Sequence, residues 1–278
     1  MPEQAPTLVD CVNLSRLVQT QLAFDSVAAI YDGPRGNNAL IQRMRELSWR
    51  LTSRYLAAGS RLIDIGCGTG IDAEHFARAG YEVLATDWSP QMVARAQARA
   101  AQSGLQHRLR TQCIGAQELQ RIDGVFDGAY SNFGPLNCVP DLTAVSRQCS
   151  RLLAPGGHLI FSVIGRICPW ELAYYLLRLR PRRALVRFAR RMTAVSLNQH
   201  TVWSRYYTPR EFYRRFENEF ELLQFRALNL FLPPPYLVGF FQRAPRFNRA
   251  LAWADDNLGA WPVLRSAGDH FLMILRRR

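Results

Sequence analysis

The chain contains no lysine, and all 35 of its basic residues are arginine. It also contains no uninterrupted apolar run of about 18 residues, the length at which a transmembrane helix is expected. Residues 1–30 lack the basic-then-apolar pattern of a secretory leader. We therefore expect a protein that neither spans a membrane nor is secreted.

Closely spaced pairs of metal ligands are absent as well. None of the six cysteines belongs to a CxxC pair, and the five histidines are scattered along the chain. A structural zinc site is built from such pairs, and a disulfide framework is typical of short secreted chains. The sequence predicts a cytoplasmic protein without a metal site.

The basic charge is concentrated in one segment. The formal net charge is +13. Residues 61–163 contain nine arginines and nine acidic residues, whereas residues 164–250 contain sixteen arginines and five glutamates. A nucleic-acid-binding protein carries basic residues on the surface that handles the polymer. Because the neutral segment holds the site motif described below, the charge distribution disfavours nucleic acid as the partner.

Short apolar runs alternate with helical patterns from residue 61 onward, as in sheets whose strands are joined by helical crossovers. The expected strands are 61–65, 82–86, 108–113, 125–131, 158–164, 219–228 and 269–275. Helix-capping patterns stand at Ser89-Pro90, Asp141 and Thr208-Pro209. The sequence predicts an α/β fold with a Rossmann-like, seven-stranded, mostly parallel sheet and helices on both faces.

The most informative stretch is residues 62–72, LIDIGCGTGID. Gly66, Gly68 and Gly70 permit a tight turn after a strand, which a ligand can approach closely, and free N–H groups of the next helix face that ligand. The spacing is GxGxG, whereas a dinucleotide-binding turn is GxGxxG. Asp64 can accept a hydrogen bond from a cationic group, and Asp87 ends the next strand, where a carboxylate can bind ribose hydroxyls.

These residues resemble the class I S-adenosylmethionine-dependent methyltransferases, in the small-molecule branch related to ubiquinone biosynthesis. Further motifs follow in order over about residues 24–164. Phe24-Asp25 with Tyr31-Asp32 resembles the family's lead-in, and residues 116–119 resemble its adenine loop, with Gly115 where an aspartate is frequent. Residues 152–162 resemble the entry to the fifth strand, and residues 206–212 resemble a helix start after it.

The resemblance implies that S-adenosylmethionine is the cofactor and S-adenosylhomocysteine the product. It assigns cofactor contacts to residues of the glycine turn, the strand ends, the adenine loop and the lead-in. These residues are Tyr31, Asp64, Gly66, Cys67, Gly68, Thr69, Gly70, Asp87, Trp88, Met92, Ala116, Gln117, Ser131, Asn132 and Phe133.

A small, fairly apolar methyl acceptor is expected. Residues 131–135 read SNFGP and lack the Asn/Asp-Pro-Pro-Tyr/Phe box of enzymes that methylate amino groups of bases. The segment after the fifth strand is rich in aromatic residues, as small-molecule pockets are. We expect Asn137, Trp170, Tyr206 and Tyr207 to bind the acceptor, and His200 is the candidate general base.

The interpretation divides the chain into four parts. Residues 1–60 are a helical lead-in that covers the cofactor site, and residues 61–165 form the cofactor-binding core. Residues 166–207 are a helical lid rich in arginine and aromatics, with helices at 169–179 and 182–192. Residues 208–278 complete the sheet and include a helical stretch within 237–258.

Other functions remain open from the sequence alone. The basic segment can dock RNA or a protein substrate, and the fold can serve cyclisation, cofactor binding alone or, with a nicotinamide cofactor, hydride transfer. The helix at 182–192 places Arg183, Arg187 and Arg190 on one face, which is typical of a solvated helix and also suits peripheral contact with an anionic membrane. Nothing in the sequence specifies an oligomeric state.

Overall fold

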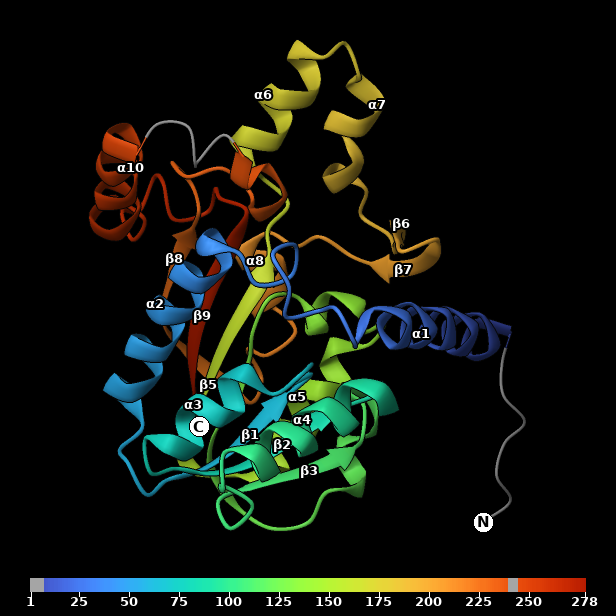
Figure 1. Ribbon diagram of the computed structural model, residues 1–278, viewed down its shortest axis with the longest axis vertical. Coiled ribbons are helices and arrows are strands. Elements are labelled where there is room, and N and C mark those ends of the chain that lie inside the picture. The colour runs from blue at the N-terminus through green and yellow to red at the C-terminus, as the bar shows by residue number, and fades with distance from the viewer. Residues whose placement is uncertain (1–7, 240–244) are drawn as a thin grey trace.

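The computed structural model describes residues 8–239 and 245–278. Its main strands are β1 (Arg61–Ile65), β2 (Glu82–Asp87), β3 (Leu109–Cys113), β4 (Phe126–Ser131), β5 (Leu153–Ile164), β8 (Phe220–Leu228) and β9 (His270–Arg277). They form one sheet in the order β3-β2-β1-β4-β5-β9-β8 (Figure 1). Neighbouring strands from β3 to β5 are parallel, and β9 is antiparallel to both of its neighbours. The predicted Rossmann-like, mostly parallel sheet is confirmed.

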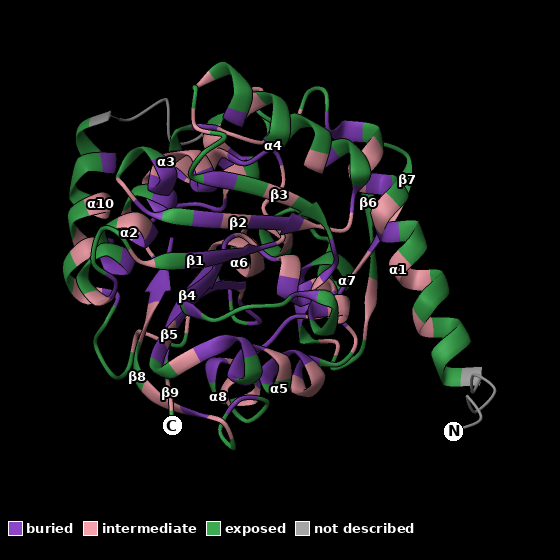
Figure 2. Ribbon diagram, turned by 90° about the horizontal axis from the view of Figure 1, so that it is seen from below, coloured by how far each residue is buried: buried purple, intermediate pink, exposed green. Residues whose placement is uncertain are grey.

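Helices cover both faces of the sheet, and each face has its own apolar core (Figures 1 and 2). One face carries α2 (Ala39–Tyr55), α3 (Ile71–Arg78) and α4 (Pro90–Gln102), and the other carries α5 (Leu142–Leu152) and α8 (Pro209–Tyr213). The strands between the two cores are buried on both sides, as expected of a parallel sheet.

The predicted caps set the starts of three helices. Ser89 Oγ accepts from the backbone N–H of Met92, with Pro90 in the first helical turn. Asp141 caps α5, and Thr208 with Glu211 forms a capping box at α8. These caps fix where the chain turns from a loop into a helix beside the sheet.

Two segments lie over the carboxyl ends of the parallel strands. Helix α1 (Leu8–Val27) packs against a hairpin made of β6 (Thr193–Leu197) and β7 (His200–Ser204). Both segments project from the side of the central body in Figures 1 and 2. The hairpin lies within the predicted lid, at its carboxyl end.

The predicted helix at 182–192 is wrong. Helix α6 (Pro169–Leu177) is followed by α7 (Pro181–Ala184) and one 3-10 turn, Val186–Phe188. Arg187 is buried, because its guanidinium lies among the carboxylates of Glu171 and Asp269 and the Gly165 carbonyl. The residues after it alternate as a strand does and form the hairpin, so the insertion is not helical throughout.

At the carboxyl end of the chain, α10 (Pro245–Leu258) precedes the last strand. Residues 240–244 of the helical stretch expected within 237–258 lie outside the described residues. Among the residues that the structure describes, no helix is long and apolar enough to cross a membrane.

Candidate active site

A cavity of about 240 Å³ lies at the carboxyl ends of β1, β2 and β4, the edge at which open α/β sheets bind ligands. Its floor is the glycine turn and the adjoining strand ends, and its roof is α1 and the β6–β7 hairpin. The residues that line the roof and outer wall include Leu17, Thr20, Gln21, Phe24, Cys138, Val139, Ile164, Val195, Val202, Ser204 and Tyr206.

The glycine turn leaves backbone open to the cavity. Gly66 and Gly68 have φ values of 77° and 53°, which non-glycine residues adopt rarely. A Cβ on Gly66 would lie 2.3 Å from Pro135, whereas on Gly68 the nearest neighbour is Tyr31 at 3.8 Å. Gly66 is therefore required by packing, and Gly68 leaves a free face toward the cavity.

Asp87 is tied to the turn by two backbone hydrogen bonds. Its Oδ2 accepts from the N–H of Gly68 at 2.9 Å, and its Oδ1 accepts from the N–H of Ser89 at 2.8 Å. Burial raises the pKa of this carboxyl above its ordinary value. Each carboxylate oxygen can accept more than one hydrogen bond, so Asp87 retains acceptors for a pair of ligand hydroxyls.

The opposite end of the cavity brings a cation and an anion together. Arg45 and Asp72 are both buried and form an ion pair at 2.7 Å. The indole N–H of Trp49 donates to Asp72 at 2.6 Å, and Ser48 donates to the side-chain carbonyl of Asn132 at 2.8 Å. Arg45 Nε and Asn132 Nδ2 have no partner, which leaves donors for a ligand carboxylate.

Asp64 lies beneath this end of the site and is 2% exposed. Its Oδ2 has no hydrogen-bond partner. Burial, and then the neighbouring carboxylate of Asp72, raises its pKa well above the usual range. The buried Asp64 carboxyl, which interacts with the Tyr130 hydroxyl but has an oxygen without a partner, and the Arg45 guanidinium together fit the amino and carboxylate groups of S-adenosylmethionine. The residues present therefore fit the cofactor that the sequence predicts.

The remaining floor is aromatic and amide in character. Trp88, Met92, Ala116 and Gln117 line the cavity beyond Asp87. The Gln117 Nε2 is buried without a partner, so this side of the cavity offers both a flat apolar surface and a free hydrogen-bond donor. Such a surface fits a purine ring.

The roof is fastened to the floor by polar contacts from the lead-in. Gln21 donates to the carbonyl of Trp88 at 3.0 Å. Asp25 accepts from the Ser89 hydroxyl, and the Thr69 hydroxyl donates to Asp32. The acidic residues of the predicted lead-in therefore hold α1 and the segment after it over the glycine turn.

Comparison with known proteins agrees with this geometry. A family profile described as a methyltransferase domain matches residues 62–157. Ubiquinone biosynthesis O-methyltransferase of Xanthomonas oryzae pv. oryzae (strain PXO99A) is 37% identical over 137 residues, covering 48% of this chain and 56% of that protein. The Xylella fastidiosa (strain 9a5c) protein of the same name is 35% identical over 137 residues, covering 48% and 55%. The chain spans about half the length of these curated relatives.

Residues 62–157 match the profile of a methyltransferase domain and lie within the parallel part of the sheet.

Solved structures extend the likeness of fold beyond the methyltransferase domain. The (4+2)-cyclase SpnF is 22% identical with a TM-score of 0.58, and the match covers 99% of this chain and 97% of that one. The 1,6-didemethyltoxoflavin-N1-methyltransferase of Burkholderia thailandensis is 17% identical with a TM-score of 0.58, covering 99% and 93%. At these identities the matches establish the fold alone.

The structure brings most of the predicted cofactor residues to the cavity of the methyltransferase domain. Those that line it are Tyr31, Gly66, Cys67, Gly68, Thr69, Asp87, Trp88, Met92, Ala116, Gln117, Asn132 and Phe133. Asp64, Gly70 and Ser131 do not line it. Gly70 lies against Ala96, where a Cβ would be 2.8 Å away, and the Ser131 hydroxyl donates to the Ile65 carbonyl. These two hold the turn and strand in place.

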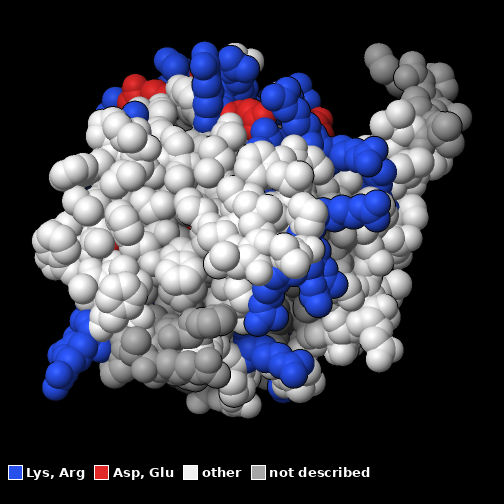
Figure 3. Space-filling view, turned by 90° about the horizontal axis from the view of Figure 1, so that it is seen from above, with Lys and Arg blue, Asp and Glu red and all other residues white. Residues whose placement is uncertain are grey.

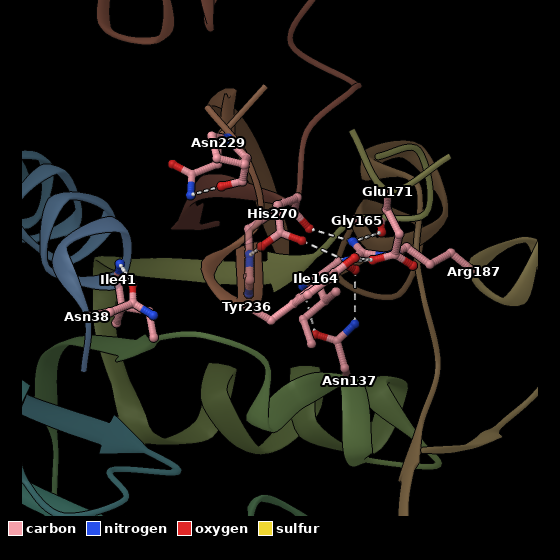
Figure 4. A network of polar contacts seen from close by, with 12 residues as sticks. Asn38, Ile41, Asn137, Ile164, Gly165, Glu171, Arg187, Asn229, Tyr236 and His270 are labelled. Atoms are coloured by element: carbon pink, nitrogen blue, oxygen red, sulfur yellow. Dashed lines mark hydrogen bonds and ion pairs between the residues drawn. The ribbon is translucent and has the colours of Figure 1, made fainter. Parts of the chain in front are cut away.

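Of the predicted acceptor residues, only Tyr206 lines the cavity. Both ends of the Asn137 side-chain amide bond the backbone of Ile164 (Figure 4). The Trp170 indole donates to the carbonyl of Phe231 at 2.7 Å. Tyr207 is buried in the core against Phe212. The structure therefore gives these three predicted residues structural contacts away from the cavity.

His200 does not lie at the cavity. It begins β7 and is exposed, because residues 198 and 199 form the tight turn of the hairpin with φ values of 47° and 66°. This turn carries the histidine to the tip of the hairpin, away from the glycine turn. The structure gives no support to its predicted role as a general base.

Several lining residues were missed from the sequence. Arg45 comes from α2, where Arg45, Ser48 and Thr52 are buried polar residues on one helix face. That polar stripe on an otherwise apolar face was a usable signal. Val202 and Ser204 come from the β6–β7 hairpin, in a part of the predicted lid for which no strand was expected.

A second group of buried charges lies outside the cavity, where the insertion meets the sheet. Arg187 pairs with Glu171 and Asp269, each at 2.7 Å, and donates to the Gly165 carbonyl (Figure 4). The carboxylate of Asp269 also contacts His270 at 2.9 Å. Potential ligand atoms of Cys168, Glu171 and Asp269 lie within 4.8 Å of one another, but the guanidinium of Arg187 already supplies the cation. We call this group the Arg187 node.

Proposed function

We propose that this chain is a cytoplasmic enzyme that transfers a methyl group from S-adenosylmethionine to a small, fairly apolar acceptor. The observation that carries the proposal is one continuous cavity. Its floor is the glycine turn and its roof is formed by apolar residues of α1 and the hairpin. The cofactor and the acceptor would therefore meet in a space that is shielded from water.

The proposed cofactor contacts follow from the polar atoms of the floor. Asp87 binds the ribose hydroxyls, and Arg45 with Asn132 binds the carboxylate, because their free donors lie at that end. Asp64 and Asp72 supply the negative charge for the amino group. Trp88, Met92, Ala116 and Gln117 enclose the adenine.

The bound cofactor supplies a methyl group activated by the sulfonium. Held by Asp87, Arg45 and Asn132, it would supply this methyl group to the acceptor and leave as S-adenosylhomocysteine. The chain therefore has to align the acceptor and exclude water. Leu17, Phe24 and Val202 form part of the roof that does so.

The acceptor class is inferred from the wall and from the relatives. Phe24, Val139, Ile164 and Val195 give the acceptor side an apolar surface, which is typical of small-molecule pockets. The curated relatives are named as O-methyltransferases of ubiquinone biosynthesis. These observations support a specialised metabolite, a quinone or a lipid-like molecule as acceptor, methylated on oxygen, nitrogen or carbon.

The direct test is formation of S-adenosylhomocysteine from methyl-labelled S-adenosylmethionine, with a panel of apolar phenols, quinols and amines. The proposal predicts label in at least one small acceptor, together with an equal amount of S-adenosylhomocysteine. Cofactor binding with no S-adenosylhomocysteine formed would favour cyclisation or another non-methyl reaction. Label in added RNA or protein, with salt-dependent affinity, would favour the polymer alternative.

We further propose that the tip of the insertion makes peripheral contact with an anionic membrane. Leu177 and Leu179 are 85% and 89% exposed, and Arg178, Arg180 and Arg182 are exposed beside them. Figure 3 shows arginines gathered beside a broad surface without charged side chains. Exposed leucines can enter the interface while arginines meet anionic headgroups.

Sedimentation with vesicles tests this contact. The protein should sediment with vesicles that contain phosphatidylglycerol and remain in solution with pure phosphatidylcholine. Binding should fall in the Leu177→Ser, Leu179→Ser double variant and at high salt. Equal sedimentation with both vesicles, or no effect of the double variant, would contradict the contact.

A further inference from the structure

Ser204 has a buried hydroxyl that nothing in the fold uses. The residue is 4% exposed, it lines the cavity, and its Oγ has no hydrogen-bond partner. A buried polar group without a partner is costly, and native proteins rarely keep one without a reason. A ligand group at this point of the wall would provide the missing partner.

The direction of β7 places the Ser204 side chain on the cavity side. Side chains alternate along a strand, and Val202 and Ser204 of β7 both line the cavity, as does Tyr206 just after the strand. Trp203, between Val202 and Ser204, lies on the opposite side of the strand, and its indole N–H donates to Gln19 of α1 at 2.7 Å. The roof therefore presents an apolar, a hydroxyl and a phenolic side chain in succession.

The position of this wall is fixed from behind. The carbonyl of Asn137 accepts from the N–H of Arg205 at 2.8 Å, and its side-chain amide donates to the Arg205 carbonyl at 2.7 Å. The guanidinium of Arg187 lies 5.4 Å from the ring centroid of Tyr206. A wall held this way can orient a ligand group without rearranging.

The fully buried side-chain polar atoms without a partner in the described lining residues fall into two sets. Arg45 Nε, Gln117 Nε2 and Asn132 Nδ2 belong to the floor, and the proposed cofactor uses them. The hydroxyl of Ser204 belongs to the roof, across from that set. The lining of the cavity also includes the apolar residues Val195, Val202 and Ile164.

We propose that Ser204 is a specificity-determining residue that binds an oxygen atom of the acceptor. The acceptor is then an apolar, ring-sized molecule with a hydroxyl or carbonyl oxygen near the reacting atom. Ser204 holds and orients this oxygen but removes no proton, and Tyr206 closes the wall beside it. This inference rests on the proposed function.

A pair of isosteric probes tests it. 2-Naphthol and 2-methylnaphthalene differ by a hydroxyl in place of a methyl group, and each is titrated calorimetrically into protein loaded with S-adenosylhomocysteine. We expect the wild-type protein to bind 2-naphthol about tenfold more tightly, as one well-formed hydrogen bond allows. Ser204→Ala should bring the two affinities close together, and Ser204→Thr should keep the difference.

Ser162→Ala is the matched control, because Ser162 is also a buried serine with an unpartnered hydroxyl, on β5 and outside the cavity lining. It should leave the ratio of affinities unchanged. An unchanged ratio in Ser204→Ala, or no binding of either probe, would overturn the role of Ser204. Failure of the wild-type protein to bind S-adenosylhomocysteine at the loading step would instead overturn the proposed function.

Discussion

Asp64 and Asp269 are both buried, at 2% and 3% exposure, but their surroundings are opposite. Asp269 faces Arg187 and His270, whose charges hold the pKa of its carboxyl well below the usual range despite burial. Asp64 has an oxygen without a partner, and burial and Asp72 raise its pKa well above that range. The charge of Asp269 is therefore balanced by basic side chains of the fold, whereas the carboxyl of Asp64 has no basic partner in an ion pair among the described residues.

This difference distinguishes buried charges that stabilise the fold from buried polar groups that are available to a ligand. At the Arg187 node, opposite charges are matched within the fold, and the node ties the insertion to the end of β5 and the start of β9. Buried polar atoms without partners occur at both places: Arg187 Nε at the node, and Arg45 Nε, Gln117 Nε2 and Asn132 Nδ2 in residues that line the cavity. Only those of the cavity lie where a ligand can supply the partner. A cofactor that supplies these partners would stabilise the folded protein when it binds.

The largest expected effect is at the node. Replacing Arg187 by leucine leaves the buried Asp269 carboxylate and the half-buried Glu171 carboxylate without their guanidinium partner. The free energy of unfolding should fall by about 3–5 kcal/mol, as for other broken buried ion pairs, measured by urea denaturation. Arg183→Leu is the control on the exposed surface and should change it by less than about 0.5 kcal/mol. Equal effects of the two variants would show that the node is not an anchor.

The next largest effect is on the affinity for the cofactor product, and it tests whether the polar groups of the cavity floor bind a ligand. Arg45→Met should weaken S-adenosylhomocysteine binding by about 10–100-fold, the range for hydrogen bonds to charged groups. Binding of 5′-methylthioadenosine, which lacks the carboxylate, should be unchanged. Calorimetry measures both, and Arg43→Met, from the same helix but outside the cavity lining, is the control. A similar loss for both ligands would show that Arg45 acts through the fold.

Asp64→Asn should separate stability from binding. The amide removes the cost of a buried carboxyl, so the free energy of unfolding of the ligand-free protein should rise by about 0.5–2 kcal/mol, typical of a stabilising substitution. The affinity for S-adenosylhomocysteine should fall in the same variant. Asp123→Asn, at an exposed position, should change neither. A less stable Asp64→Asn protein would contradict the view that this carboxyl is unmatched.

The smallest effect is a difference in pH dependence, measured by urea unfolding between pH 7 and pH 3. Because the folded-state pKa of Asp269 is lowered, its contribution to stability is present above the ordinary aspartate pKa of about 3.9 and is lost as the pH falls below it. For Asp64 the folded-state pKa is raised, so its cost appears as the pH rises above about 3.9. The loss of unfolding free energy in Asp269→Asn and the gain in Asp64→Asn should therefore both become smaller as the pH falls. If either variant differed more from the wild-type protein at pH 3 than at pH 7, the directions of these two pKa shifts would be contradicted.

The floor of the site was largely predictable from the sequence. Gly66, Gly68 and Asp87 lie where a strand turns into a helix, and there local geometry determines which residues meet the ligand. The sheet and the three helix caps could also be predicted, because they too depend on local sequence patterns. The prediction that Arg183, Arg187 and Arg190 share one helix face was wrong. The helix ends at Ala184, and the guanidinium of Arg187 is buried against the carboxylates of Glu171 and Asp269, which come from other parts of the chain.

The roof was not predictable in this way. Tyr206 was found through its aromatic neighbourhood, but Ser204 and Val202 depend on a hairpin that packs on a helix about 180 residues earlier in the chain. His200 was misplaced for the same reason, since the position of a hairpin tip is set by tertiary contacts. Local sequence patterns do not carry that information.

Calorimetric titration with S-adenosylmethionine and, separately, with NADH tests the central claim most directly. The account predicts one-to-one binding of S-adenosylmethionine that is lost in Asp87→Ala and retained in Glu82→Ala, which changes an exposed residue at the other end of the same strand, and no binding of NADH. Binding of NADH in its place, or S-adenosylmethionine binding that is unaffected by Asp87→Ala, would contradict it.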